Sequence, residues 1–249
     1  MLGLDAWTIV VAVAIVLLGG TISGVTGFGF GLVVVPFLLI LFPPATVVLT
    51  AKGLGLLTGV AILLADHRHA DRPTIAGLAP WAYLGLPFGL LILRRVDAEV
   101  IRLVAGAVVV LFAALATTGR LPPGIRSPRA PRVVGVASGV LGTSIGMPGP
   151  PVVLLLSSHE LEPVAFRATI TGYFAVVDTF AVVLLFATGT VGVHEAAIAL
   201  GLFPVALVGR SLGRILGLRV ERERFRRLTL GLLILTGLSA VATALLALR

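Results

Sequence analysis

Two stretches rich in glycine and proline, residues 23–31 and 142–151, contain the residues whose types and spacing are best suited to chemistry. Each stretch interrupts a long apolar run. Backbone that leaves a helix inside a bilayer strands its N–H and C=O groups, unless it lines a cavity that protein encloses or water fills. The two stretches therefore predict a binding cavity at membrane depth. The alternative is close packing of helices through small residues.

An anion is the ligand that such a cavity would favour. The segments that leave the two stretches, near Gly31 and near Pro151, are expected to begin half-helices whose N-termini point into the cavity. Unbonded N–H groups and roughly half a positive charge at each N-terminus attract anions, and neighbouring hydroxyls add donors. Alternatively, these hydroxyls bond back to their own helices. The residues predicted to bind substrate are Ser23, Thr26, Gly27, Gly29, Gly31, Lys52, Ser138, Gly142, Thr143, Ser144, Gly149 and Pro150.

Three charged residues inside apolar runs are further candidates. Lys52 is the only lysine of the chain and lies about two turns inside its run, where it either attracts the anion or extends its ammonium to the membrane surface. Asp178 lies near the middle of another run, and a buried carboxylate there is either protonated or paired. We predict that Asp178 couples transport to protons or pairs with Lys52, Arg210 or Arg214. Arg210 is the second predicted member of this coupling or ion-pair site, with extension to the membrane surface as its alternative.

Enzymatic chemistry is not expected. The segment Gly142–Gly146 fits the Gly-x-Ser-x-Gly pattern of hydrolase nucleophiles, but that pattern requires a strand-to-helix turn, which this sequence does not predict. The sequence has no cysteine and no phosphate-binding Gly-x-x-x-x-Gly-Lys-Ser/Thr stretch. We therefore predict no cofactor and no metal. His67 and His69, beside two aspartates, are expected to belong to a solvated loop rather than a metal site.

The composition indicates a membrane protein. Hydrophobic residues make up 58% of the 249 residues, and charged residues make up 12%, well below the roughly 25% of a soluble domain. We predict an all-α polytopic protein of the inner (plasma) membrane, in which residues 6–42 and 133–158 form broken helices, hairpins or short pairs. Apolar runs of spanning length predict ordinary transmembrane helices over residues 45–65, 74–93, 100–118, 164–188, 194–217 and 225–248.

The two halves of the chain resemble each other. Gly24 and Pro36 match Gly139 and Pro151, both 115 residues later, and two further blocks of glycine, proline and arginine align at slightly larger offsets. We predict an N-terminal transmembrane repeat of residues 1–119, a basic connecting loop of residues 120–132 and a C-terminal transmembrane repeat of residues 133–249. Duplication with interrupted helices at matching places is typical of secondary transporters, whose broken elements meet near the bilayer midplane.

Loop arginines predict the orientation. They account for most of the net charge of +8, and in short loops they indicate the cytoplasmic face rather than nucleic-acid binding. If each broken region crosses the membrane once, the repeats are parallel and the loop arginines divide almost evenly between the two faces. If each crosses zero or two times, the repeats are inverted and most loop arginines share one face. We expect inverted repeats, with residues 66–73, 120–132 and 219–227 in the cytoplasm and both termini outside.

These motifs resemble the sulfite exporter TauE/SafE family. In the first half the resemblance lies in the glycine-rich run from Gly27 to Pro36, and in the second half it lies in residues 138–151 and in the run from Gly209 to Arg214. Bulky Phe28 and Phe30 depart from the purer glycine run of many members. The resemblance extends from about residue 18 to the end of the chain.

The resemblance implies a membrane permease for sulfite, sulfonates or related organosulfur anions. We expect a secondary transporter that works by alternating access around a midplane site. Its partners would be a small anion, the lipid bilayer and, in a homo-oligomer, further copies of the same chain. A passive anion channel and a non-transporting membrane scaffold are the alternatives.

Overall fold

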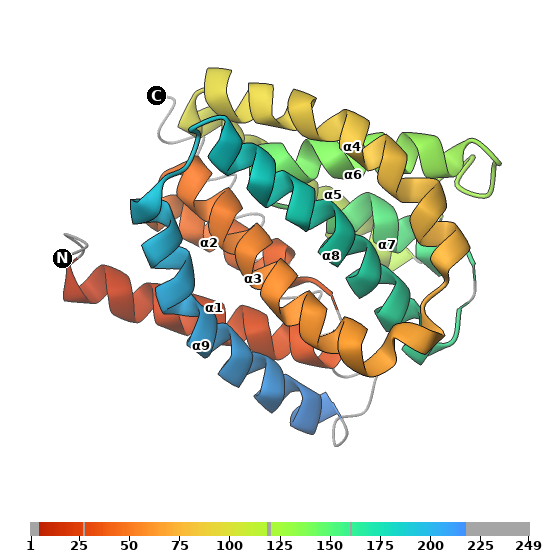
Figure 1. The fold of residues 1–249 in the computed structure, drawn as a ribbon, viewed down its shortest axis with the longest axis horizontal. Coiled ribbons are helices and arrows are strands. Elements are labelled where there is room, and N and C mark those ends of the chain that lie inside the picture. The colour runs from red at the N-terminus through yellow and green to blue at the C-terminus, as the bar shows by residue number, and fades with distance from the viewer. Residues whose placement is uncertain (1–4, 27, 119–120, 160, 218–249) are drawn as a thin grey trace.

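A computed structural model describes residues 5–26, 28–118, 121–159 and 161–217. Within these ranges the chain is helical and contains no strand, which confirms the predicted all-α class. The elements are α1 (Ala6–Thr26), α2 (Phe30–Leu41), α3 (Pro44–Asp66), the short 3-10 helix η1 (His67–His69), α4 (Arg72–Arg95), α5 (Ala98–Thr118), α6 (Ala130–Ile145), α7 (Gly149–Ser157), α8 (Pro163–Ala187) and α9 (Val193–Gly217) (Figure 1).

The protein is a multi-pass membrane protein. Five described helices are long and apolar enough to cross a bilayer, namely α1, α4, α5, α8 and α9. Large apolar side chains lie on the outer surface, as with Phe88 and Phe180, which are 62% and 57% exposed. Lipid is the environment in which this exposure is favourable. The bounds of α3, α4, α5, α8 and α9 agree with the predicted spans to within two residues, and the sixth predicted span, residues 225–248, lies outside the described residues.

Both predicted helix interruptions are present. In each half a longer helix is followed after three residues by a short one, α2 with 12 residues and α7 with 9. At 1.5 Å per residue these measure about 18 and 14 Å, which is too short to cross a hydrocarbon core of about 30 Å. Glycine is required at both interruptions, because Gly29 has a φ of 90° and Gly146 a φ of 76°, conformations that side chains disfavour.

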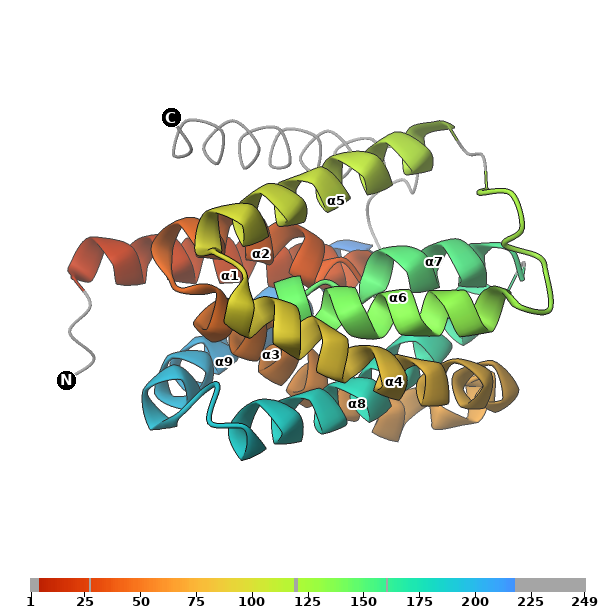
Figure 2. The same ribbon diagram turned by 90° about the horizontal axis from the view of Figure 1, so that it is seen from above.

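Corresponding helices of the two halves run in opposite directions. Both views show that α1 runs opposite to α6, α3 opposite to α8, and α4 opposite to α9 (Figures 1 and 2). The turn between α3 and α4 and the loop between α5 and α6 lie at one end of the molecule, whereas the α4–α5 and α8–α9 connections lie at the other. These directions are the ones that inverted repeats require.

Two helix pairs pack through glycine at very short distances. α4 packs along α6, and α1 packs along α9. A Cβ atom added to Gly85 of α4 would lie 2.3 Å from the carbonyl oxygen of Val136, and one added to Gly209 of α9 would lie 2.5 Å from that of Leu17. Gly209 lies 124 positions after Gly85, and Leu17 lies 119 positions before Val136. The two pairs therefore repeat the same packing.

This packing corrects the alignment of the first sequence block. A Cβ added to Gly139 would meet the carbonyl oxygen of Ala82, and one added to Gly20 would meet that of Ala206. Gly20 is therefore the structural equivalent of Gly139, 119 residues apart, whereas the sequence alignment matched Gly24 with Gly139. The error is four residues, about one helical turn, and the helix preserves the apolar and small-residue pattern over that shift. The boundary of the predicted loop is also moved, because α6 begins at Ala130 rather than after residue 132.

Candidate functional site

A cavity of about 70 Å³ lies where the two interruptions meet. A cavity of this size holds several water molecules. It is lined by residues of the first interruption and the start of α2, by residues of the second interruption and the start of α7, and by side chains from α1, α3, α8 and α9. The start of α2 contacts the second interruption there, since a Cβ atom on Gly31 would lie 2.8 Å from the carbonyl oxygen of Gly146.

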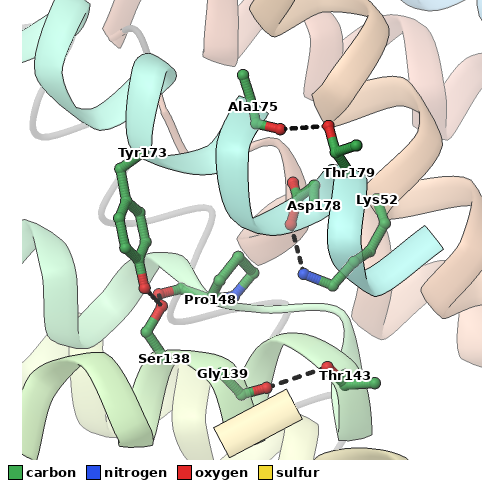
Figure 3. A network of polar contacts seen from close by, with 9 residues as sticks. All are labelled: Lys52, Ser138, Gly139, Thr143, Pro148, Tyr173, Ala175, Asp178 and Thr179. Carbon is green, nitrogen blue, oxygen red and sulfur yellow. Dashed lines mark hydrogen bonds and ion pairs between the residues drawn. The ribbon is translucent and has the colours of Figure 1, made fainter. Parts of the chain in front are cut away.

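A buried ion pair forms part of the cavity wall. The Lys52 ammonium of α3 donates a hydrogen bond to Oδ1 of Asp178 on α8, and the two side chains are 1% and 5% exposed (Figure 3). Glycines on neighbouring segments leave room for both groups. A Cβ atom on Gly142 would lie 2.9 Å from Nζ of Lys52, and one on Gly55 would lie 3.2 Å from Oδ2 of Asp178. The pair therefore fits between α3, α6 and α8.

Further polar groups give the cavity a positive balance. Arg210 of α9 lines it together with Lys52 and Asp178, so the charged lining in the described part of the chain is two cations and one carboxylate. Ser23 of α1 and Thr171 of α8 add hydroxyls. An anion entering this space would meet net positive charge in a low-dielectric surrounding, where the attraction is stronger than in water.

The two half-helices differ as anion sites. Helix α2 begins at Phe30, and the amide of Val33 donates to the carbonyl oxygen of Gly29 at 3.1 Å. The N–H groups of residues 30–32 therefore have no acceptor within their own helix. Helix α7 begins Gly-Pro-Pro, and proline has no N–H. The N-terminus of α2 thus offers more donors to an anion than that of α7.

Ser138 of α6 hydrogen-bonds to the second interruption. Its hydroxyl donates to the carbonyl oxygen of Pro148 at 2.8 Å and accepts from the hydroxyl of Tyr173 at 2.9 Å (Figure 3). Ser138 and Tyr173 are fully buried. This chain of hydrogen bonds connects α8 to α6 and holds the carbonyl group of Pro148, the residue that caps α7.

The structure brings most of the predicted site residues to the cavity. Lys52 and Asp178 form the ion pair, and Thr143 and Ser144 donate to the carbonyl oxygens of Gly139 and Val140, as the alternative interpretation of the hydroxyls expected. Gly27 and the side chain of Thr26 lie outside the described residues. Those lining the cavity are Ser23, Gly29, Gly31, Lys52, Gly149, Pro150, Asp178 and Arg210, whereas Ser138, Gly142, Thr143 and Ser144 are not among its lining residues.

Sequence reasoning missed several lining residues. Phe28, Phe30 and Phe174 supply aromatic walls, and Phe28 also packs edge-to-face against Phe166 with ring centroids 6.0 Å apart. Phe28 and Phe30 were noted only as departures from a family pattern. The predicted duplication pairs Thr171 with Lys52, 119 residues earlier, and Thr171 lines the cavity although it was not among the predicted site residues.

An all-helical membrane protein whose two helix interruptions meet at a cavity lined by two cations and one carboxylate has the architecture of a membrane permease. The chain belongs to the sulfite exporter TauE/SafE family, and the model of this family matches residues 12–240. This confirms the family resemblance drawn from the glycine and proline motifs. The family consists of exporters rather than enzymes, in line with the predicted lack of enzymatic activity.

A curated relative supports the assignment over nearly the whole chain. The probable sulfite/organosulfonate exporter TauE of Cupriavidus necator is 28% identical over 230 residues, which cover 89% of each protein. No solved structure matches the chain significantly.

Proposed function

We propose that this protein is a secondary transporter of a small sulfur oxyanion, sulfite or an organosulfonate, in the cytoplasmic membrane. The observation that carries the proposal is the cavity between the two helix interruptions, with Lys52 and Arg210 in its wall and the amides of α2 at its edge. The substrate class follows from the relative in Cupriavidus necator, whose name specifies sulfite and organosulfonates.

Alternating access is the proposed mechanism. The anion binds where the two interruptions meet, and movement of one repeat past the other exposes the cavity first to one side of the membrane and then to the other. The glycine-lined contacts of α1 with α9 and of α4 with α6 are the proposed sliding surfaces, because helices without protruding side chains can shift along each other with little steric obstruction.

Flux through proteoliposomes tests the proposal. Purified protein reconstituted with sulfite inside should show saturable efflux that is accelerated by external sulfite, since exchange is the property of an alternating carrier. Flux that rises linearly with concentration would indicate a passive channel. Absence of flux, together with no change in melting temperature on adding sulfite, sulfate, thiosulfate, taurine or sulfoacetate, would indicate a scaffold and contradict the proposal.

A matched pair of arginines on α9 tests the location of the site. Arg210 lines the cavity, whereas Arg214, one turn later, is exposed. Arg210→Gln should weaken sulfite binding at least tenfold, and Arg214→Gln should leave it within about twofold, because an exposed charge is screened by solvent. Equal effects of the two substitutions would contradict the location.

A further inference from the structure

The Lys52 ammonium is where an anion and Asp178 would compete. Lys52 lies in the cavity wall, yet its hydrogen bond is directed at Oδ1 of Asp178 (Figure 3). An anion that takes this ammonium leaves the carboxylate almost fully buried, beside a second negative charge. A buried charge without its partner is strongly unfavourable, and a nearby like charge adds to the cost.

We propose that the cavity binds one proton together with each anion. Resting on the proposed function, this inference specifies the co-substrate of the same site. The anion replaces Oδ1 of Asp178 as acceptor of the Lys52 hydrogen bond, and a proton from bulk solvent, passed through the cavity water, forms an O–H bond on the released carboxyl group. No electrons are transferred. The net charge of the cavity is +1 before binding, from Lys52, Arg210 and ionised Asp178, and is still +1 once the anion is bound and Asp178 is protonated.

The proton acceptor in this proposal is the carboxylate of Asp178 rather than one of the titratable groups around it. Lys52 faces it from α3, and Arg210 lines the cavity from α9. In the described part of the chain the phenol of Tyr173 on α8 is a further titratable neighbour, and the phenol of Tyr83 on α4 is near Tyr173. Helix α7 contains no titratable residue. The η1 turn packs on α8. Asp71, two residues after it, donates its backbone N–H to Oγ1 of Thr169, which lies nine residues and about 14 Å along the helix from Asp178.

Methanesulfonate is a suitable probe, because it is a small sulfonate with no titratable proton of its own near neutral pH. Its binding to purified protein in detergent would be followed by calorimetry in two buffers of different ionisation enthalpy, which counts the protons taken up. We expect about one proton per bound anion, and a dissociation constant that rises about tenfold per pH unit wherever the free protein holds Asp178 ionised.

Two variants locate the proton. Asp178→Asn keeps the size of the side chain but cannot ionise, so its binding should be independent of pH, with no proton uptake. Asp97→Asn, at an exposed position between α4 and α5, is the matched control and should retain the uptake of one proton. If Asp178→Asn does not fold, the proton count of the native protein still decides the question.

The possible outcomes separate this inference from the proposed function. Binding of methanesulfonate without proton uptake overturns the inference and leaves the anion site intact. The inference is equally overturned if Asp178→Asn keeps the native pH dependence, or if sulfite binds and methanesulfonate does not. If neither anion binds, both the inference and the proposed function fail.

Discussion

At the scale of single residues, the ion pair explains how an apolar helix accommodates the only lysine of the chain. Lys52 and Asp178 are both removed from solvent, and their desolvation is compensated by their mutual attraction and hydrogen bond. Such a pair contributes little net stability compared with an apolar pair of the same volume. Its position in the cavity wall therefore points to a role in binding rather than in folding.

Breaking the pair should be far more harmful than removing it. Lys52→Met leaves Asp178 buried without a partner and should lower the unfolding free energy by about 3–5 kcal/mol, whereas Lys52→Met combined with Asp178→Leu should recover most of that loss. Melting temperatures in detergent measure both effects. A double variant no more stable than the single one would contradict the expected coupling.

The Ser138 hydroxyl is predicted to matter more than that of its partner. Ser138→Ala leaves the carbonyl of Pro148 and the hydroxyl of Tyr173 without their bonds, at about 1–3 kcal/mol for each unsatisfied group, whereas Tyr173→Phe removes one hydrogen bond worth about 0.5–1.5 kcal/mol. Melting temperatures rank the variants. Thr179→Ala is the control, because its hydroxyl bonds only to its own helix at Ala175. A Ser138→Ala effect no larger than the control would show that the bond chain does not support the interruption.

Residue chemistry could be predicted from sequence where a charge stood alone in an apolar run, as with Lys52 and Asp178. The choice among Lys52, Arg210 and Arg214 as partners of Asp178 could not, because it depends on which faces of α3, α8 and α9 meet. The hydroxyls near the second interruption show the same limit. Thr143 and Ser144 point their hydroxyls at carbonyls one turn earlier in α6, and the sequence left that alternative open.

At the scale of elements, the glycines of the two tight helix pairs set how closely the backbones approach. Gly139→Ala would place a Cβ atom 2.2 Å from the carbonyl oxygen of Ala82, and Gly24→Ala one 2.3 Å from that of Arg210. Each should destabilise the protein by about 1–3 kcal/mol through overpacking, and should slow transport if these surfaces slide.

Two glycines on the partner helices of these pairs are controls for this prediction. Gly77 in α4 and Gly201 in α9 have no atom within 4 Å of an added Cβ. Replacing either with alanine should leave stability unchanged or raise it by up to about 1 kcal/mol, since alanine restricts the unfolded chain. Melting temperatures that fall equally at all four positions would contradict the role assigned to the packing.

Helix positions were predictable from hydropathy because membrane spans have a minimum length, and the starts of α2 and α7 agree with the expected half-helices to within two residues. The register between the halves was not. Small residues recur every four positions along α1, at Gly20 and Gly24, so an alignment shifted by one turn matches almost as well as the correct one. Only the packing partners on α9 and α4 distinguish the two.

At the scale of the whole molecule, opposite helix directions and repeated contacts point to one relation between the halves. We propose that the halves are inverted copies (Figures 1 and 2). Their two interruptions meet at the cavity. In such a pair, corresponding helices of the two halves cross the membrane in opposite directions. The charge of Lys52 then breaks the symmetry, because its counterpart Thr171 is neutral, and the cavity is polarised towards one half.

Inverted and parallel repeats predict different locations for two histidines. His69 precedes α4 and His194 opens α9, and both are exposed. They occupy matching places in the two halves, so inverted repeats put them on opposite faces of the membrane and parallel repeats put them on the same face. Because the chain has no cysteine, His69→Cys and His194→Cys can be labelled without background. A membrane-impermeant maleimide added to intact cells should label His194→Cys and reach His69→Cys only in inverted vesicles, where the arginine-rich loops are exposed. Labelling of both from the same side would exclude inversion, and with it the proposed exchange of access between the two halves.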